Sequence, residues 1–240
     1  MEIWDLYDEN RRLTGETMVR GDPVPKGRYH LVLDALFLNG KGELLFQRRA
    51  DEKELYPGMW AETGGSALQG EDSRTAVARE VAEELGFLPD LEHSRVMLTQ
   101  WGKEKGFVRD VYLFWQDVLL SAMRFQPEEV QDARWVLPED IYKDEKMAGD
   151  LAHISYWDQL WPYLCLESMR VRIPAGTYRH YKGNLYQVEG LSLHSETLEP
   201  MVNYRALYGM GERWVRPARM WREEITLPDG RQVRRFQIEK

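Results

Sequence analysis

One segment constrains this chain more than any other, the run from Gly65 to Phe87, which reads GSALQGEDSRTAVAREVAEELGF. A glycine, five spacers, a glutamate and seven spacers precede Arg-Glu-hydrophobic-x-Glu-Glu-x-Gly-hydrophobic. Asp72 or Ser73 can cap a helix, Gly86 can end it in a left-handed turn, and neither glycine nor proline interrupts the stretch between them. The segment therefore predicts a loop followed by one amphipathic helix.

Three carboxylates share one face of the predicted helix, at relative positions i, i+3 and i+4: Glu80, Glu83 and Glu84. An apolar stripe at four-residue spacing lies on another face: Val77, Val81 and Leu85. Arg79 can offset only part of the repulsion among the carboxylates. Mg²⁺ or Mn²⁺ would supply the missing positive charge, because hard cations prefer oxygen ligands. For Glu83 and Glu84 taken alone, an ordinary solvated acidic face is the alternative.

The complete pattern resembles the signature of the Nudix hydrolases, a family of metal-dependent enzymes. The resemblance implies that Glu80, Glu83 and Glu84 bind the metal together with the backbone carbonyl of Gly64. It places Glu80, Glu83 and Arg79 in the catalytic machinery, and Glu71 beside Arg79 as a supporting partner. It also implies attack of water on a phosphorus atom of a nucleoside diphosphate that is linked to another moiety.

A general base and the substrate pocket must come from outside this segment. In the family the base is usually one more glutamate, and Glu129, just before an expected strand at 133–136, is our first candidate, with Glu128 second. Both are equally compatible with plain loop carboxylates. The residues that we expect to line the substrate pocket are His30, Arg48, Arg49 and Trp60.

Two other functions remain open. Trp4-Asp5-Leu6-Tyr7-Asp8 and the general layout also resemble isopentenyl-diphosphate isomerases, whose catalytic cysteine belongs just ahead of the Gly65–Phe87 segment. This chain has Trp60-Ala61-Glu62-Thr63-Gly64 there, and its single cysteine is Cys165. The third reading is a catalytically silent nucleotide sensor or RNA-binding protein with the same fold, which the intact set of glutamates disfavours.

The order of predicted elements indicates an α/β (α+β) protein. Strand-like runs at 30–38 and 43–48 flank Asn39-Gly40, a strong hairpin signal. More strands are expected at 95–101, 108–117 and 134–136, and a closing helix at 151–166. The family resemblance implies a mixed sheet between helices, and we expect this domain to span residues 1–168.

Residues 169–240 differ from the preceding part of the chain in residue pattern and in charge. They hold 13 Lys and Arg against 8 Asp and Glu, within a chain of net charge −8. Short strand-like runs between turns predict a small β-rich domain, and four motifs resemble a small uncharacterised bacterial domain family: Tyr178–Gly183, His194–Thr197, Leu207–Gly209 and Trp214–Pro217. The interleaved aromatic and basic residues suit either single-stranded nucleic acid or, the reading that we favour, an aromatic core with arginines at its edge.

Composition narrows the cellular setting. One cysteine excludes an internal disulfide, and the acidic start MEIWDLYDEN lacks the pattern of a signal peptide, so we expect a cytoplasmic protein. The expected partner is a small-molecule diphosphate and not a membrane. Nucleic acid is the less favoured alternative, and the chain could also form a homodimer.

Overall fold

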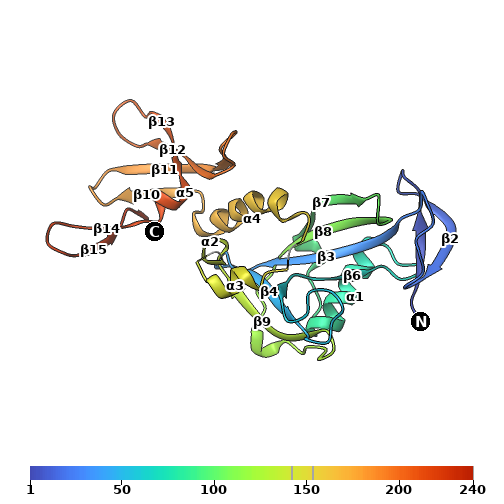
Figure 1. The fold of residues 1–240 in the computed structure, drawn as a ribbon. Coiled ribbons are helices and arrows are strands. Elements are labelled where there is room, and N and C mark those ends of the chain that lie inside the picture. Colours follow the sequence, from blue (N-terminus) through green and yellow to red (C-terminus); the bar gives the residue numbers. More distant parts are fainter. Residues whose placement is uncertain (142, 153, 240) are drawn as a thin grey trace. The chain divides into compact units, whose positions relative to one another are not determined.

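The computed structural model describes residues 1–141, 143–152 and 154–239. The chain divides into two compact units, Met1–Tyr156 and Trp157–Lys240 (Figure 1). Residue 168, where we expected the first domain to end, lies inside a helix that runs from Trp157 to Arg172. The division into 1–168 and 169–240 stays a prediction.

The first unit carries strands β1 (Ile3–Tyr7), β2 (Leu13–Val19), β3 (His30–Leu38), β4 (Leu44–Arg49), β5 (Trp60–Ala61), β6 (Thr63–Ser66), β7 (Ser94–Gly102), β8 (Phe107–Trp115) and β9 (Val130–Val136). Its helices are α1 (Ser73–Leu85), α2 (Pro138–Ile141) and α3 (Glu145–Gly149), with short 3₁₀ turns at Leu91–His93 and Leu120–Ala122. β1 and β2 form a separate hairpin.

The main sheet is mixed, with strand order β5-β4-β3-β8-β7; β6 also pairs with β3, and β9 with β4. β3 lies parallel to β8 and antiparallel to β6, so it is central and reads as a nearly continuous apolar run. The predicted hairpin between β3 and β4 is confirmed. Asn39 Oδ1 closes its turn by accepting hydrogen bonds from the backbone N–H groups of Lys41 and Glu43, at 3.0 and 2.9 Å.

Helix α1 packs its apolar face on this sheet. Ala76, Val77, Val81 and Leu85 are fully buried in a core that includes the side chains of β3 and β8. Figure 1 shows α1 running beside β6, the strand that precedes it in the chain. The predicted mixed sheet with helices is confirmed, and α1 holds its polar face at the end of β6.

The second unit starts with α4 (Trp157–Arg172) and contains β10 (Gly176–His180), β11 (Leu185–Leu193), β12 (Pro200–Ala206), β13 (Arg213–Pro217), α5 (Ala218–Trp221), β14 (Glu224–Thr226), β15 (Gln232–Arg234) and β16 (Phe236–Ile238). An antiparallel sheet has the order β13-β12-β11-β10-β16, and β14 and β15 form a hairpin. The predicted β-rich domain is confirmed. Its buried rings, Tyr178, Tyr204, Trp221 and Phe236, share one core, which favours the structural reading of these aromatics.

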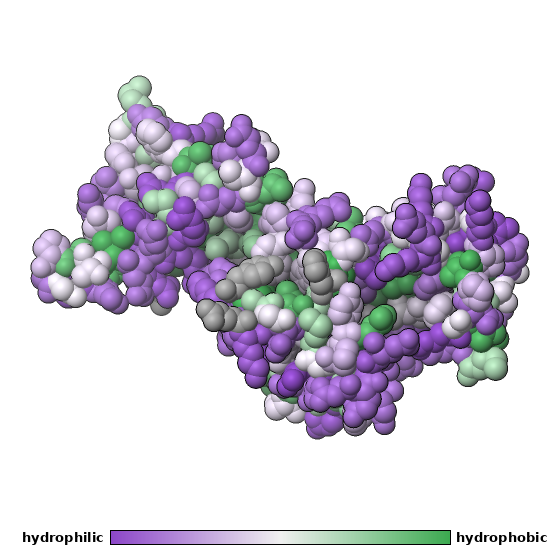
Figure 2. All heavy atoms as spheres, in the orientation of Figure 1, coloured by the Kyte–Doolittle hydropathy of each residue, from purple (hydrophilic) through white to green (hydrophobic). Residues whose placement is uncertain are grey.

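The helices of the described residues are all too short or too polar to span a membrane. On the face drawn in Figure 2, hydrophilic residues cover most of each unit, and hydrophobic residues form small patches among the hydrophilic ones.

Candidate active site

The loop and helix of the Gly65–Phe87 segment form where the sequence predicts them. Asp72 caps α1, since its side chain accepts a hydrogen bond of 2.8 Å from the backbone N–H of Thr75. Gly86 ends the helix with φ +75° in the left-handed region. These two ends fix which residues of α1 face the sheet and which face the end of β6.

Arg79 connects the loop to the helix. Its Nε and Nη2 donate to the two carboxylate oxygens of Glu71 at 2.8 and 3.0 Å, and Nη2 also donates to the carbonyl of Ser66 at 3.0 Å. Nη1 pairs with Glu80 at 3.0 Å and with Glu83 at 2.9 Å. The structure thus places Glu71 and Arg79 in contact, with Arg79 between two of the expected metal-binding glutamates.

Glu80 lies against the backbone of the strand before the helix. A Cβ atom at Gly65 would stand only 2.2 Å from the carboxylate carbon of Glu80, so only glycine leaves room there. At Gly64 a Cβ atom would stand 2.5 Å from Asp34 Oδ1. Glycines at both positions let β6 approach the carboxylates closely.

Glu84 is the most unusual carboxylate of the helix, because only 4% of it is exposed. Within the described chain, its Oε2 has no hydrogen-bond partner. Burial first, and then the negative charges of Glu80 and Glu129, raise the pKa of Glu84 to about 8. A buried oxygen without a partner costs free energy, and a bound cation would remove that cost.

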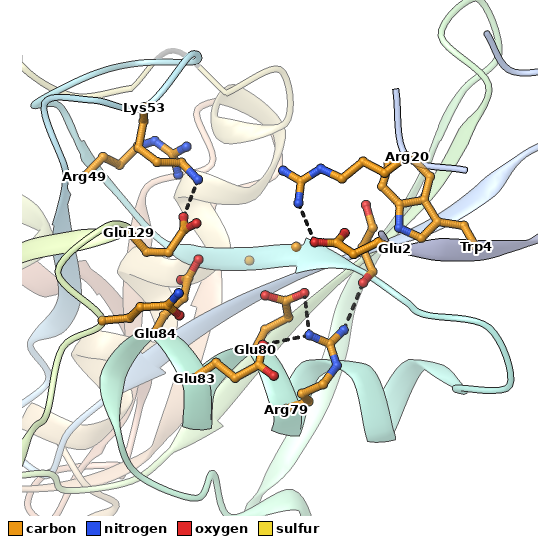
Figure 3. Close-up of a pocket in the computed structure, with 14 residues that line it drawn as sticks. Glu2, Trp4, Arg20, Arg49, Lys53, Arg79, Glu80, Glu83, Glu84 and Glu129 are labelled. Atoms are coloured by element: carbon orange, nitrogen blue, oxygen red, sulfur yellow. Dashed lines mark hydrogen bonds and ion pairs between the residues drawn. The ribbon is translucent and has the colours of Figure 1, made fainter. Parts of the chain in front are cut away.

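These groups line a cavity of about 260 Å³ (Figure 3). Its wall is made of Glu2, Trp4, Arg20, Arg49, Lys53, Gly64, Gly65, Ser66, Arg79, Glu80, Glu83, Glu84, Gln126 and Glu129. Figure 3 shows Arg49, Lys53 and Glu129 on one side and Glu2, Trp4 and Arg20, which lie in or next to β1 and β2, on the other. The cavity therefore presents several carboxylates and several cations at one place.

The two candidate bases differ in position. Glu129 lines the cavity near Glu84 and forms an ion pair with Lys53. Glu128 is exposed and lies outside the lining. The geometry makes Glu129 the better placed of the two.

The donor set fits a hard cation, although the described residues do not form a ready metal cage. Across 1–141, 143–152 and 154–239, no three His, Cys, Asp or Glu side chains are placed to hold one ion. The guanidinium of Arg79 forms ion pairs with both Glu80 and Glu83. The donors that remain are oxygens, and the unpartnered Oε2 of Glu84 is the one that most needs a positive charge.

Of the four residues expected to line the substrate pocket, Arg49 faces this cavity. His30 stacks on Trp4 with ring centroids 4.4 Å apart, and Arg48 Nε donates to the carbonyl of Gly58 at 2.9 Å. Trp60 is buried beneath Arg134, whose guanidinium carbon lies 3.9 Å from the ring centroid. Their contacts are with neighbouring protein groups, and none of these three lines the cavity.

The structure has a second cavity, of about 510 Å³, which we did not predict from the sequence. It shares Arg49, Gly64, Gly65 and Ser66 with the first, so the two adjoin at β6. Two almost fully buried carboxylates, Asp34 and Glu62, also line it. The available signal was Asp34, an acidic residue inside the apolar run of β3.

Comparisons with known proteins agree with this geometry. The NUDIX domain matches residues 28–157, and a protein family of unknown function, DUF1653, matches residues 176–238. An uncharacterized Nudix hydrolase of Listeria monocytogenes is 45% identical over 162 residues, which cover 67% of this chain and 94% of that protein.

Two further proteins are similar over the same region. An isopentenyl-diphosphate Delta-isomerase of Nocardia farcinica is 29% identical over 64% of this chain and 88% of that protein. A crystal structure from Deinococcus radiodurans, 24% identical, superposes with a TM-score of 0.54 over 68% of this chain and 99% of that one. The matched domain and the Listeria relative decide the assignment: the chain belongs to the Nudix hydrolase family.

Proposed function

We propose that this Nudix hydrolase cleaves the diphosphate bond of a nucleoside diphosphate linked to another moiety, with Mg²⁺ or Mn²⁺ as cofactor. The observation that carries the proposal is Glu84, a buried carboxylate with one unpartnered oxygen, in a cavity that it shares with Glu80 and Glu129. A cation together with the substrate's phosphates would satisfy both the acidic and the basic groups of that cavity.

The residues that would hold the metal are Glu80, Glu83, Glu84 and the backbone carbonyl of Gly64. When bound, such an ion neutralises phosphate oxygens and lowers the pKa of water. Glu71 supports the arrangement indirectly, because its two hydrogen bonds fix the guanidinium of Arg79 beside Glu80.

The chain's own side chains have two tasks in the reaction. Glu129 is the proposed general base, accepting a proton from the attacking water at its carboxylate. Arg49 and Lys53 carry positive charge on the same wall and would bind phosphate oxygens. The attacking oxygen forms a bond to phosphorus while the bond from phosphorus to the bridging oxygen breaks, and the second phosphate leaves with the bridging oxygen.

The chain lacks a cysteine at the position where an isopentenyl-diphosphate isomerase would have its catalytic cysteine. Residues 60–64 lead into the Gly65–Phe87 segment without a cysteine, and Cys165 belongs to α4 in the second unit. We therefore do not propose isomerisation, although a named isomerase is among the relatives.

The proposal is tested by incubating the full chain with Mg²⁺ or Mn²⁺ and a panel of sugar nucleotides, dinucleoside polyphosphates and coenzymes. We expect two phosphate-containing products from at least one substrate, no products in excess EDTA, and ¹⁸O from labelled water in one product phosphate. Intact substrates across the whole panel, with metal bound, would overturn the proposal and favour a nucleotide sensor.

A further inference from the structure

The second cavity adjoins the proposed reaction centre and has a different chemical character. Arg49, Gly64, Gly65 and Ser66 line both cavities, and the carboxylates of α1 line only the first. A substrate whose diphosphate lies in the first cavity would extend its remaining part into the second.

Four titratable side chains from separate parts of the chain meet here. Asp34 comes from β3, Glu62 from the residue between β5 and β6, Arg109 from β8, and Tyr156 from the end of the first unit. Arg109 Nε lies 3.1 Å from Asp34 Oδ2, and the Tyr156 hydroxyl donates to Glu62 Oε1 at 2.8 Å. Asp34 and Glu62 are only 6% and 7% exposed.

One oxygen of this cluster, Glu62 Oε2, lacks a hydrogen-bond donor among the described residues. Arg109 is the cation that acts on both carboxylates, and it pairs directly with Asp34. Glu62 Oε2 is buried and, within the described chain, has no hydrogen-bond partner. A buried acceptor left alone costs about 1–3 kcal/mol, so a ligand that brings a donor to Glu62 gains affinity by that route.

Aromatic rings form another part of the wall. Phe107 and Tyr56 line the cavity, and the guanidinium carbon of Arg109 lies 5.0 Å from the Phe107 ring centroid and 5.5 Å from that of Tyr156. Arg109 is thereby fixed between two rings, which also fixes Asp34. A flat ligand ring with a donor at its edge suits such a wall better than an aliphatic chain, because an aliphatic chain would leave the carboxylates unpaired.

We propose that this cavity binds the nucleobase of the substrate and that Glu62, in its ionised form, selects bases with an exocyclic amino group, which donates a hydrogen bond to the Glu62 carboxylate. The inference rests on the proposed hydrolysis only for the position of the diphosphate. It names cytosine and adenine as preferred over uracil and hypoxanthine, which carry an oxo group at the corresponding position.

The test compares substrates that differ only at that position: CDP-glucose with UDP-glucose, and ADP-ribose with its hypoxanthine analogue. Burial raises the pKa of Glu62 to about 8, so the assay is run at about pH 9, where the carboxylate is ionised. There we expect the wild-type chain to prefer the amino-bearing member of each pair by at least about tenfold in kcat/KM, as sites built around one hydrogen bond do. Glu62→Gln keeps the side-chain volume and should reduce that preference to near unity or reverse it. Glu92→Gln, an exposed carboxylate of the 91–93 turn, is the matched control and should keep the preference.

A second readout needs no turnover. Saturation-transfer NMR on the metal-free chain at the same pH should show stronger contact with CMP than with UMP, and Glu62→Gln should equalise the two contacts. Equal kinetics and equal binding for both bases in the wild type, or a preference for the oxo base, would overturn the inference. A binding preference for CMP without hydrolysis of any nucleotide would instead overturn the proposed reaction and leave the base site standing.

Discussion

At the scale of single residues, burial controls the chemistry of the first unit. Glu84 and Glu62 are buried carboxylates whose pKa values are raised, mainly by loss of solvent. Glu129, in contrast, forms an ion pair with Lys53, and both residues line the same cavity as Glu84. The glutamates of this unit therefore have different electrostatic surroundings, which suit the different roles that we propose for them.

Glu129→Gln tests the proposed base. Removing a general base should lower kcat by about 10²–10⁴-fold while changing KM much less. Glu128→Gln is the matched control, because that residue is exposed and lies outside the cavity. Unchanged turnover in Glu129→Gln would remove Glu129 from the mechanism.

His30 gives the first unit a sensitivity to acid. Burial, and then the positive charge of Arg109, lowers the pKa of His30 to about 4, against about 6.5 in an unfolded chain. The unfolded state therefore binds more protons between these values. Stability that is fully present above pH 6.5 is lost as the pH falls towards 4, by up to about 1.4 kcal/mol per pH unit.

The substitution His30→Phe keeps a ring against Trp4 and removes the titration. We expect urea denaturation of this variant to show a smaller loss of stability between pH 6.5 and 4 than the wild type. Parallel curves for the two proteins over that range would contradict the assignment.

At the scale of elements, local signals were sufficient for α1 and for the β3–β4 hairpin. Asp72, Gly86 and Asn39 act on their immediate neighbours, so their effects can be predicted from nearby sequence. β10 and β13 are short runs of polar or mixed residues, so the local pattern gives no clear strand signal for either of them. The pairing of β3 with β8 joins residues about 77 positions apart, and no local pattern specifies it.

The same limit explains which part of the site was predicted. Glu80, Glu83 and Glu84 come from one helix turn, whose spacing the sequence shows directly. Asp34 and Arg109 come from different strands, and only sheet register brings them together. The second cavity could therefore not be predicted from spacing along the chain.

Gly86→Ala tests how α1 ends. Gly86 has φ +75°, and a Cβ atom there would stand 2.5 Å from the carbonyl oxygen of Arg124. Gly70→Ala is the matched control, because Gly70 has φ +84° but no atom within 4 Å of that position. We expect Gly70→Ala to cost about 1–2 kcal/mol from backbone strain alone, and Gly86→Ala to cost clearly more in urea denaturation. Equal costs would show that the contact with Arg124 is unimportant.

At the scale of the whole molecule, each compact unit has its own hydrophobic core. All residues that line the two cavities of the proposed reaction lie in Met1–Tyr156. The second unit, Trp157–Lys240, includes the region that matches the family of unknown function. Substitutions in the core of the second unit should therefore lower the stability of that unit without lowering the rate of hydrolysis.

Trp221→Ala tests that separation. Trp221 is 1% exposed and stacks on Phe236 with ring centroids 3.7 Å apart, so its truncation should cost about 3–5 kcal/mol of the second unit's stability. Phe114→Ala in the first core is the matched control. We expect calorimetry to show that each variant weakens a different transition, and that Trp221→Ala keeps the wild-type kcat at 25 °C. Loss of hydrolysis in folded Trp221→Ala would tie the second unit to catalysis.

We propose that buried Glu84 binds the catalytic cation. The most direct test of this proposal is the turnover of Glu84→Gln with Mg²⁺ on the best substrate, measured beside the exposed control Glu92→Gln. We predict that Glu84→Gln folds, lacks one anionic ligand and loses at least about 100-fold in kcat, while Glu92→Gln matches the wild type. A folded Glu84→Gln variant with wild-type turnover would contradict the account.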